Sequence, residues 1–443
     1  MLVEAPSARR PRCSCRGRRR AALALVLTAA IFAVGAASAS AVIVRVGARS
    51  LSYQPVPGAG AQLQPSRMQA LPGLAPLMRS GPPLEYHGGP VMPANANYAF
   101  YWDPAGAPVY PAGYQAGLDR YFEDLAHDSG GVQNTDSVLT QYGDEAGEFA
   151  NYDSLFAGAL IDTDPYPPNG CSAAPICLTD EQLQTELTRY VTEHALPANL
   201  THEYFMLTPP GVESCFEAKG HSCSPGTSRP SYCAYHADIA VTGGVIIYAN
   251  DPFISAESGC DPGEEHPNDL PSDATIGGGL AHEHSESVTD PELDAWYDQR
   301  GNEVADKCAT YQEASEFGEP LGRAPDGAKY NQVINGDLYW YQQEWSNLAG
   351  GCVQRSPSAP VVSKLKHRRG PAAGGTSVTL TGTGFIGASE VEFGSHEAAG
   401  FEVASANSIT AISPPGTGTV DIRVITPGGK SAINGSDRFT YRR

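Results

Sequence analysis

Residues 273–290 read DATIGGGLAHEHSESVTD, and the expected fold and chemistry of this chain depend on them. The stretch begins with aspartate, a residue type that caps helices, and proline follows it, so a helix is predicted between the two. Residues four apart lie only about 40° from one another around a helix. His282 and Glu286 therefore share one face, and Glu283 lies about 100° from His282.

This spacing indicates a cation site. In zinc hydrolases with an H-E-x-x-H helix, both histidines bind the metal, and the glutamate acts as general base toward metal-bound water. Here Glu286 replaces the second histidine, so His282 and Glu286 are predicted metal ligands and Glu283 the predicted catalytic base. His284 points about 160° away from His282 and is excluded from the same site. Zinc is the favoured cation, although a carboxylate-rich ligand set shifts preference toward Mn²⁺ or Ca²⁺.

A metal site needs a third protein ligand, and Asp306 is the favoured candidate. It lies two residues before Cys308, which a disulfide would hold in place. Glu303 is the second choice. Glu292 has metzincin-like spacing from His282, but the residues between them depart from that pattern, so it is also less favoured.

The net charge of the chain excludes nucleic acid as a partner and also suggests a second interpretation of the helix. The chain has a formal net charge of −20, and residues 45–356 carry 13 basic and 42 acidic residues. So acidic a body repels phosphate backbones, which excludes nucleic acid as a partner. The same acidity leaves open that the H-E-x-x-E helix is an ordinary solvated surface helix.

The amino-terminal residues 1–44 are predicted to be a secretory signal peptide or an uncleaved signal anchor. Seven arginines precede an uncharged stretch, residues 21–44, that contains the small-residue site Ala37-Ser38-Ala39, the pattern of an export signal. Residues 45–84, which are rich in proline, glycine and alanine, are predicted to be a linker. Either form of the leader places the body outside the cytoplasm, secreted or membrane-anchored and facing outward.

Eight cysteines lie in the acidic body, and an even number in an exported chain favours disulfides over zinc clusters. The sequence alone does not select among the pairings. Pairing of nearest neighbours would join Cys171–Cys177, Cys215–Cys223, Cys233–Cys260 and Cys308–Cys352.

Residues 85–355 are predicted to form one disulfide-braced α+β domain, because strands and helices mix without strict βαβ alternation. Strands are expected at 97–102, 138–142, 203–207 and 245–249, and helices at 111–126 and after the capping box Thr179-x-x-Gln182.

The last segment, residues 357–443, has short alternating strands between glycine and proline turns and predicts an all-β sandwich. Its motifs Gly374-Gly375-Thr376, Leu380–Phe385, Val391–Gly394 and Thr426–Gly429 resemble the IPT/TIG immunoglobulin-like family. The resemblance implies an accessory, spacer or binding module.

Three stretches of the main domain, Tyr86–Val91, Leu280–Pro291 and Glu303–Cys308, resemble zincin-like secreted proteins related to the phosphate-induced/EXORDIUM family. This resemblance implies a zincin-like fold in an extracellular or wall-associated protein.

Two hypotheses follow. The first is an exported metal-dependent hydrolase, metallopeptidase-like, acting on an extracellular protein or peptide. The second is a non-catalytic surface or wall protein for adhesion or signalling, which binds protein or wall polymer and holds at most a structural metal.

Overall fold

The computed structural model describes residues 43–46, 49–56, 82–228, 230–263, 265–309, 317–356, 359–385, 388, 390–405, 407–426 and 428–442. Nearly all of the predicted leader, and residues 47, 48 and 57–81 of the predicted linker, lie outside these ranges. Within them, no helix is long and apolar enough to cross a membrane.

The main domain is built on a seven-stranded mixed sheet. In spatial order, its strands are β1 (Val44–Val46), β2 (Arg49–Pro55), β9 (Tyr232–Val241), β10 (Gly244–Pro252), β7 (His202–Thr208), β4 (Asn95–Trp102) and β5 (Ser154–Asp162). The run from β10 to β5 is parallel, whereas β1, β2 and β9 join it antiparallel.

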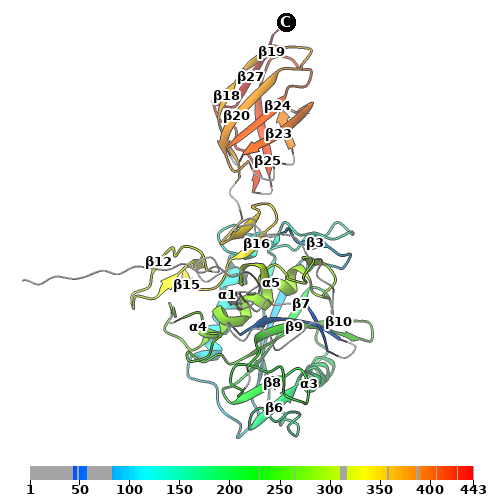
Figure 1. The fold of residues 1–443 in the computed structure, drawn as a ribbon, viewed down its shortest axis with the longest axis vertical. Coiled ribbons are helices and arrows are strands. Elements are labelled where there is room, and N and C mark those ends of the chain that lie inside the picture. The colour runs from blue at the N-terminus through cyan, green and yellow to red at the C-terminus, as the bar shows by residue number, and fades with distance from the viewer. Residues whose placement is uncertain are drawn as a thin grey trace, which may run out of the picture. The chain divides into compact units, whose positions relative to one another are not determined.

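Helices cover both faces of this sheet (Figure 1). On one face, α3 (Asp180–Glu193) packs Leu183 and Leu187 against alternate side chains of β4, β7 and β10. On the other face, α1 (Tyr114–His127) packs with the segment around Leu280 against the intervening side chains of the same strands. Because side chains alternate across a strand, the central strands are buried on both sides.

The predicted α+β class of the main domain therefore needs correction. Helices lie on both faces of one sheet, and four neighbouring strands of that sheet are parallel. Two βαβ crossovers, β4–α1–β5 and β5–α3–β7, create this parallel run. Long insertions separate helix from strand in both crossovers, so the alternation is hard to recognise in the sequence. The predicted strand at 138–142 is also wrong, because α2 (Asp136–Leu139) is a single helical turn.

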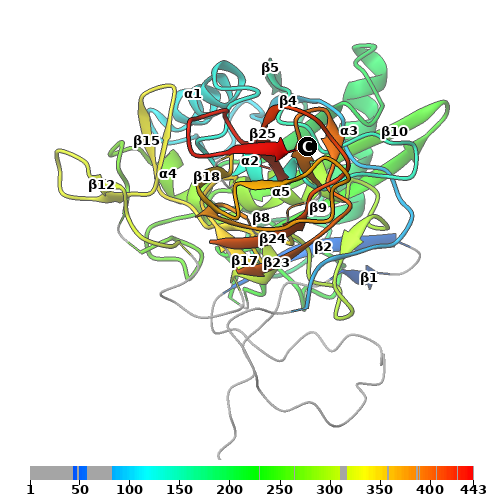
Figure 2. The same cartoon turned by 90° about the horizontal axis from the view of Figure 1, so that it is seen from above.

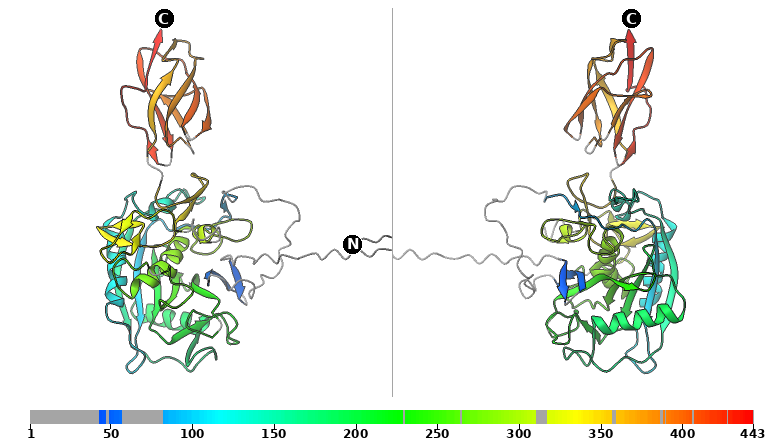
Figure 3. Two further views of the ribbon diagram at one scale, coloured as in Figure 1. Left: turned by 60° about the vertical axis from the view of Figure 1, so that its left-hand side comes forward. Right: turned by 90° about the vertical axis from the view of Figure 1, so that its right-hand side faces the viewer.

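The predicted linker is wrong for its first part. Strand β2 pairs with β9 along Ser52–Pro55, and the side chains of Leu51 and Tyr53 enter the main core. Figures 2 and 3 show β1 and β2, drawn in blue, beside the body of the main domain. This strand was not predicted, because a proline- and glycine-rich stretch follows it directly.

The helix predicted within residues 273–290 is present, and its first half contains a π-helical turn. It comprises α4 (Ser272–Thr275), a π-helical turn η1 (Ile276–Leu280) and α5 (Ala281–Thr289). A Cβ on Gly277 would lie 2.4 Å from the carbonyl oxygen of Trp340, and one on Gly278 would lie 2.2 Å from that of Cys260. The glycines thus let neighbouring backbone approach the helix closely, as expected for helix packing.

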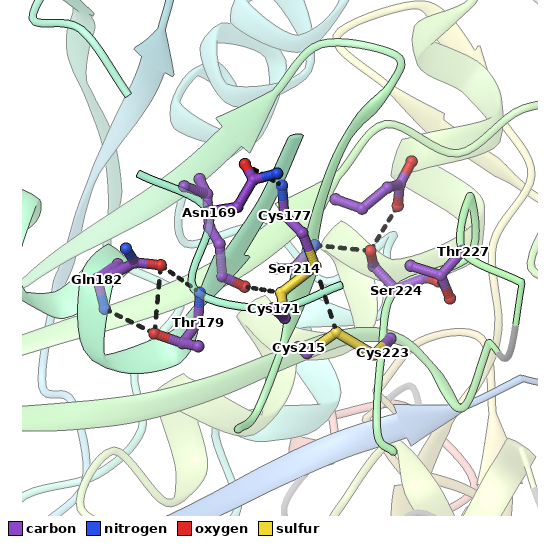
Figure 4. Close-up of a disulfide and its surroundings, with 12 residues drawn as sticks. Asn169, Cys171, Cys177, Thr179, Gln182, Ser214, Cys215, Cys223, Ser224 and Thr227 are labelled. Atoms are coloured by element: carbon purple, nitrogen blue, oxygen red, sulfur yellow. Dashed lines mark hydrogen bonds between the residues drawn. A yellow bond between two sulfur atoms is a disulfide. The ribbon is translucent and has the colours of Figure 1, made fainter. Parts of the chain in front are cut away.

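All four nearest-neighbour disulfides are present: Cys171–Cys177, Cys215–Cys223, Cys233–Cys260 and Cys308–Cys352. Figure 4 shows the first two side by side, with Sγ of Cys177 3.7 Å from Sγ of Cys215. The capping box of Thr179 and Gln182 begins α3 beside them, as predicted.

Short strand pairs and one further helical turn complete the main domain. They are β3 (Glu85–Tyr86) with β11 (Trp296–Tyr297), β6 (Ile176–Thr179) with β8 (Val212–Cys215), β12 (Gly322–Arg323) with β13 (Lys329–Tyr330), β14 (Gln332–Ile334) with β15 (Asp337–Tyr339), β16 (Glu344–Ser346) with β17 (Gly351–Val353), and the turn α6 (Asp306–Ala309).

The carboxyl-terminal segment is the predicted all-β sandwich. One sheet contains β18 (Val361–Lys366), β20 (Ser377–Thr383), β24 (Ser408–Ile412) and β23 (Gly400–Ser405). The other contains β19 (Arg369–Pro371), β27 (Arg438–Arg442), β25 (Thr419–Thr426), β21 (Glu390–Phe393), β22 (His396–Glu397) and β26 (Gly429–Lys430). Its buried cluster contains only residues of the segment itself, from Val362 to Tyr441.

Candidate metal centre

Helix α5 is nine residues long, and every one of them is buried. Its polar side chains therefore meet protein on all sides. His282 and Glu286 face the turn α6, Glu283 faces strand β9, and His284 faces strand β7 and helix α2. A solvated surface helix, the competing interpretation, does not describe this element.

The structure brings the three favoured ligands together. Nε2 of His282 lies 3.2 Å from Oε1 of Glu286 and 3.2 Å from Oδ1 of Asp306. All three side chains are at most 2% exposed. A tetrahedral zinc ion with bonds of about 2.0–2.1 Å holds its donor atoms about 3.3–3.4 Å apart. The observed spacing therefore fits a single cation.

Gln342 decides which nitrogen of His282 carries the proton. The Gln342 side-chain nitrogen donates to the carbonyl of Ala305 at 2.9 Å, so its oxygen faces Nδ1 of His282, also at 2.9 Å. Nδ1 must then be the donor, which leaves Nε2 as the ring nitrogen that can bind a cation once its own proton is displaced. Metal-binding histidines are typically oriented in this way by a partner on the other ring nitrogen. Among the described residues, Nε2 has no hydrogen-bond partner of acceptable geometry.

The electrostatics of the group follow from burial. Burial alone would lower the pKa of His282, but Glu286 and Asp306 raise it well above its ordinary value. Burial, reinforced by Glu286, raises the pKa of Asp306 well above the usual range. Burial opposes ionisation of Glu286, yet His282 lowers the pKa of this carboxylate. Closely packed acids and an imidazole of this kind favour a bound cation, which relieves carboxylate repulsion.

Glu283, the predicted base, contacts a histidine that the sequence analysis did not single out. Its Oε2 lies 3.2 Å from Nδ1 of His236, on strand β9, and both side chains are 0% exposed. Burial lowers the pKa of His236 to about 4, so the ring is neutral at physiological pH. No sequence signal marked His236, because it lies 46 residues before His282 and reaches α5 only through the packing of helix on sheet.

The two less favoured ligands have different outcomes. Glu303 is completely buried, and its Oε1 lies 3.8 Å from Nε2 of His236. His236, Glu286 and Glu303 form a second group whose ligand atoms lie within 4.8 Å of one another. Glu292 joins neither group among the described residues. It is half-buried, and its charged neighbours are Asp238 and Asp294.

His284 lies outside both groups, as its helical phase predicted. Its Nδ1 is 3.2 Å from Glu203 and its Nε2 3.3 Å from Asp136. Burial alone would lower its pKa, but these two carboxylates raise it to about 10. The residue is therefore a buried cation between two acids and is a structural element of the core.

Residues 360–441 match the model of the IPT/TIG domain family, which confirms the prediction for the carboxyl-terminal domain. A comparison with curated proteins finds no match to the chain. Similar solved structures include the full extracellular region of plexin A4, domains 1 to 8, at 24% identity and a TM-score of 0.17, over 24% of this chain and 9% of that chain. Another is SGBP-B from a complex xyloglucan utilization locus in Bacteroides uniformis, at 19% identity and a TM-score of 0.17, over 24% of this chain and 28% of that chain.

The chain thus spans less than a third of the length of either structure. None of these comparisons supports the zincin-like fold or the EXORDIUM relationship expected for the main domain, nor a hydrolase. What they establish is the family of one part of the chain: residues 360–441 are an IPT/TIG domain.

Proposed function

We propose that this chain is an exported, non-catalytic binding protein whose main domain is stabilised by a buried divalent cation. The cation would be held by His282, Glu286 and Asp306. Zinc is the first choice, with Mn²⁺ and Ca²⁺ as alternatives, because the ligand set has two carboxylates.

The observation that carries this proposal is the burial of the predicted machinery. Glu283 and Glu286 are 0% exposed and His282 is 2% exposed. A hydrolase needs an open coordination position and room for a carbonyl group beside its base. Glu283 also contacts His236, so its carboxylate can orient that imidazole without any substrate.

Export is supported by the four disulfides, which persist in oxidising compartments. Binding is assigned to the protein because an IPT/TIG domain accompanies the main domain, and such domains serve as spacers or binding units. The proposed partner is an extracellular protein or a wall polymer.

The test uses the full chain purified from a secreting host. Elemental analysis is expected to find a bound divalent cation, and EDTA is expected to lower the melting temperature of the main domain. A peptide library is expected to remain uncut by both the wild-type chain and Glu283→Gln. Glu292→Gln is the matched control for loss of one carboxylate outside the site.

Two outcomes would contradict the proposal. Hydrolysis that Glu283→Gln abolishes while the cation is retained would establish the hydrolase instead. Absence of any cation, together with melting that EDTA leaves unchanged, would remove the metal from the proposal.

A further inference from the structure

More carboxylates surround α5 than one cation neutralises. Glu283, Glu286, Glu303 and Asp306 are all 0% exposed. With all four ionised, one divalent cation would leave two formal negative charges closed off from solvent, and burying uncompensated charge is costly. Asp290, Glu344 and Asp251 are also at most 1% exposed and interact with this group. A second divalent cation would therefore lower an excess of buried negative charge.

His236 supplies a ligand atom for a second cation. Its Nδ1 lies 3.2 Å from Oε2 of Glu283, and the backbone of Asp290 also interacts with the ring. The neutral imidazole keeps a lone pair on one of its two nitrogens. Nε2 has no hydrogen-bond partner among the described residues, and the whole side chain is 0% exposed. Oε1 of Glu303 lies 3.8 Å from Nε2.

Glu286 lies between the two histidines. Its Oε1 is 3.2 Å from Nε2 of His282, and its Oε2 is 3.8 Å from Nδ1 of His236. Each carboxylate oxygen thus faces a different imidazole, one on α5 and one on β9. His236, Glu286 and Glu303 each offer one ligand atom within 4.8 Å of the others. Glu286 therefore belongs to both groups and is suited to bridge two cations, which lie about 3.5–4 Å apart in two-metal sites.

We propose that the main domain holds two divalent cations bridged by Glu286, the second of them on His236 and Glu303. This inference rests on the proposed cation at His282, Glu286 and Asp306. Imidazole combined with carboxylates suits Mn²⁺ and Zn²⁺. Glu283 is then a positioning residue that orients His236, and not a general base.

The experiment measures cation stoichiometry on the full chain, stripped of metal and titrated separately with Mn²⁺ and with Zn²⁺. The wild-type chain is expected to bind two equivalents. His236→Gln and Glu303→Gln are each expected to bind one equivalent, because they lose the second cation. His282→Gln is expected to lose the cation held by His282, Glu286 and Asp306. The matched controls His202→Gln and Glu292→Gln, outside both groups, are expected to keep two.

A spectroscopic measurement on the wild-type chain keeps the proposal testable if a variant does not fold. Two Mn²⁺ ions that share a carboxylate are expected to give a spin-coupled electron paramagnetic resonance spectrum, whereas a single ion gives an isolated six-line signal. One equivalent with an isolated signal would overturn the second cation and leave the proposed function standing. No bound equivalent would overturn both.

Discussion

Gln342 controls His282 without being a candidate ligand itself. Its amide is fixed by the carbonyl of Ala305 and in turn fixes the imidazole proton on Nδ1. Gln342→Leu removes that constraint, and loss of such an orienting partner typically costs about 10–100-fold in metal affinity. Titration with Zn²⁺ is expected to show a weakening in this range.

Gln141→Leu is the matched control, because this half-buried glutamine bonds Ser346 and the carbonyl of Val138 away from the site. Equal weakening in both variants would mean that general destabilisation, and not imidazole orientation, is responsible.

His266 gives a prediction about pH. Its Nε2 lies 2.8 Å from Oδ1 of Asp261, and this hydrogen bond raises the pKa of His266 above its ordinary value. Asp273 and Asp269 also favour the charged ring. Because the pKa of His266 is higher in the folded than in the unfolded chain, its charged form stabilises the fold. This stabilisation is complete below about pH 6.5 and is lost as pH rises through the pKa of the folded chain.

In urea unfolding from pH 6 to 9, the free energy of unfolding is therefore expected to decline as His266 loses its proton. His266→Gln is expected to remove this part of the decline. His221→Gln, an exposed position, is expected to leave the pH dependence as in the wild-type chain. A slope that is unchanged in His266→Gln would assign the decline to other groups.

At the scale of the element, the π-helical turn sets how closely α5 approaches its surroundings. Gly278→Ala places a Cβ 2.2 Å from the carbonyl oxygen of Cys260, well inside van der Waals contact, so the backbone must move. The expected cost is about 1–3 kcal/mol of unfolding free energy. Gly351→Ala, where a Cβ meets nothing within 4 Å, is expected to change stability by less than about 0.5 kcal/mol. Chemical denaturation compares the two, and equal values would show that the close approach is unimportant.

The Cys308–Cys352 disulfide holds the element that carries Asp306. It closes a loop with a sequence separation of 44, against 6 for Cys171–Cys177. The loop-entropy relation gives about 4 kcal/mol for the longer loop and about 2 kcal/mol for the shorter one. The double serine variant at Cys308 and Cys352 is expected to lose more stability and also cation affinity. The variant at Cys171 and Cys177 is expected to keep that affinity, and a loss in both would refute a local role.

Helix geometry explains how much of the site was predictable from the sequence. His282 and Glu286 share a face because their spacing is local, and the same phase excluded His284. Asp306 was predicted because it lies two residues before Cys308, which a disulfide would hold in place. His236 was not predictable, because its proximity to α5 results from the register of β9 within the sheet. Strand β2 was hidden for a similar reason, since its partner lies about 180 residues later in the chain.

At the scale of the whole molecule, the IPT/TIG domain has a buried cluster of its own. Residues 357–443 expressed alone are expected to unfold cooperatively, with a transition that EDTA does not shift. Calorimetry of the full chain is expected to show one transition that EDTA lowers and one that it leaves unchanged. A single transition, entirely sensitive to EDTA, would contradict this independence.

The complete enclosure of His282, Glu286 and Asp306 has a consequence for how the protein is made. A cation held there as proposed would reach these side chains only when the sheet and α5 open, so loading during maturation of the chain would be much faster than loading of the folded protein. The species trapped would then reflect the supply of metals in the compartment where maturation ends. Exchange afterwards would proceed at the pace of rare opening events, and not at the pace of diffusion.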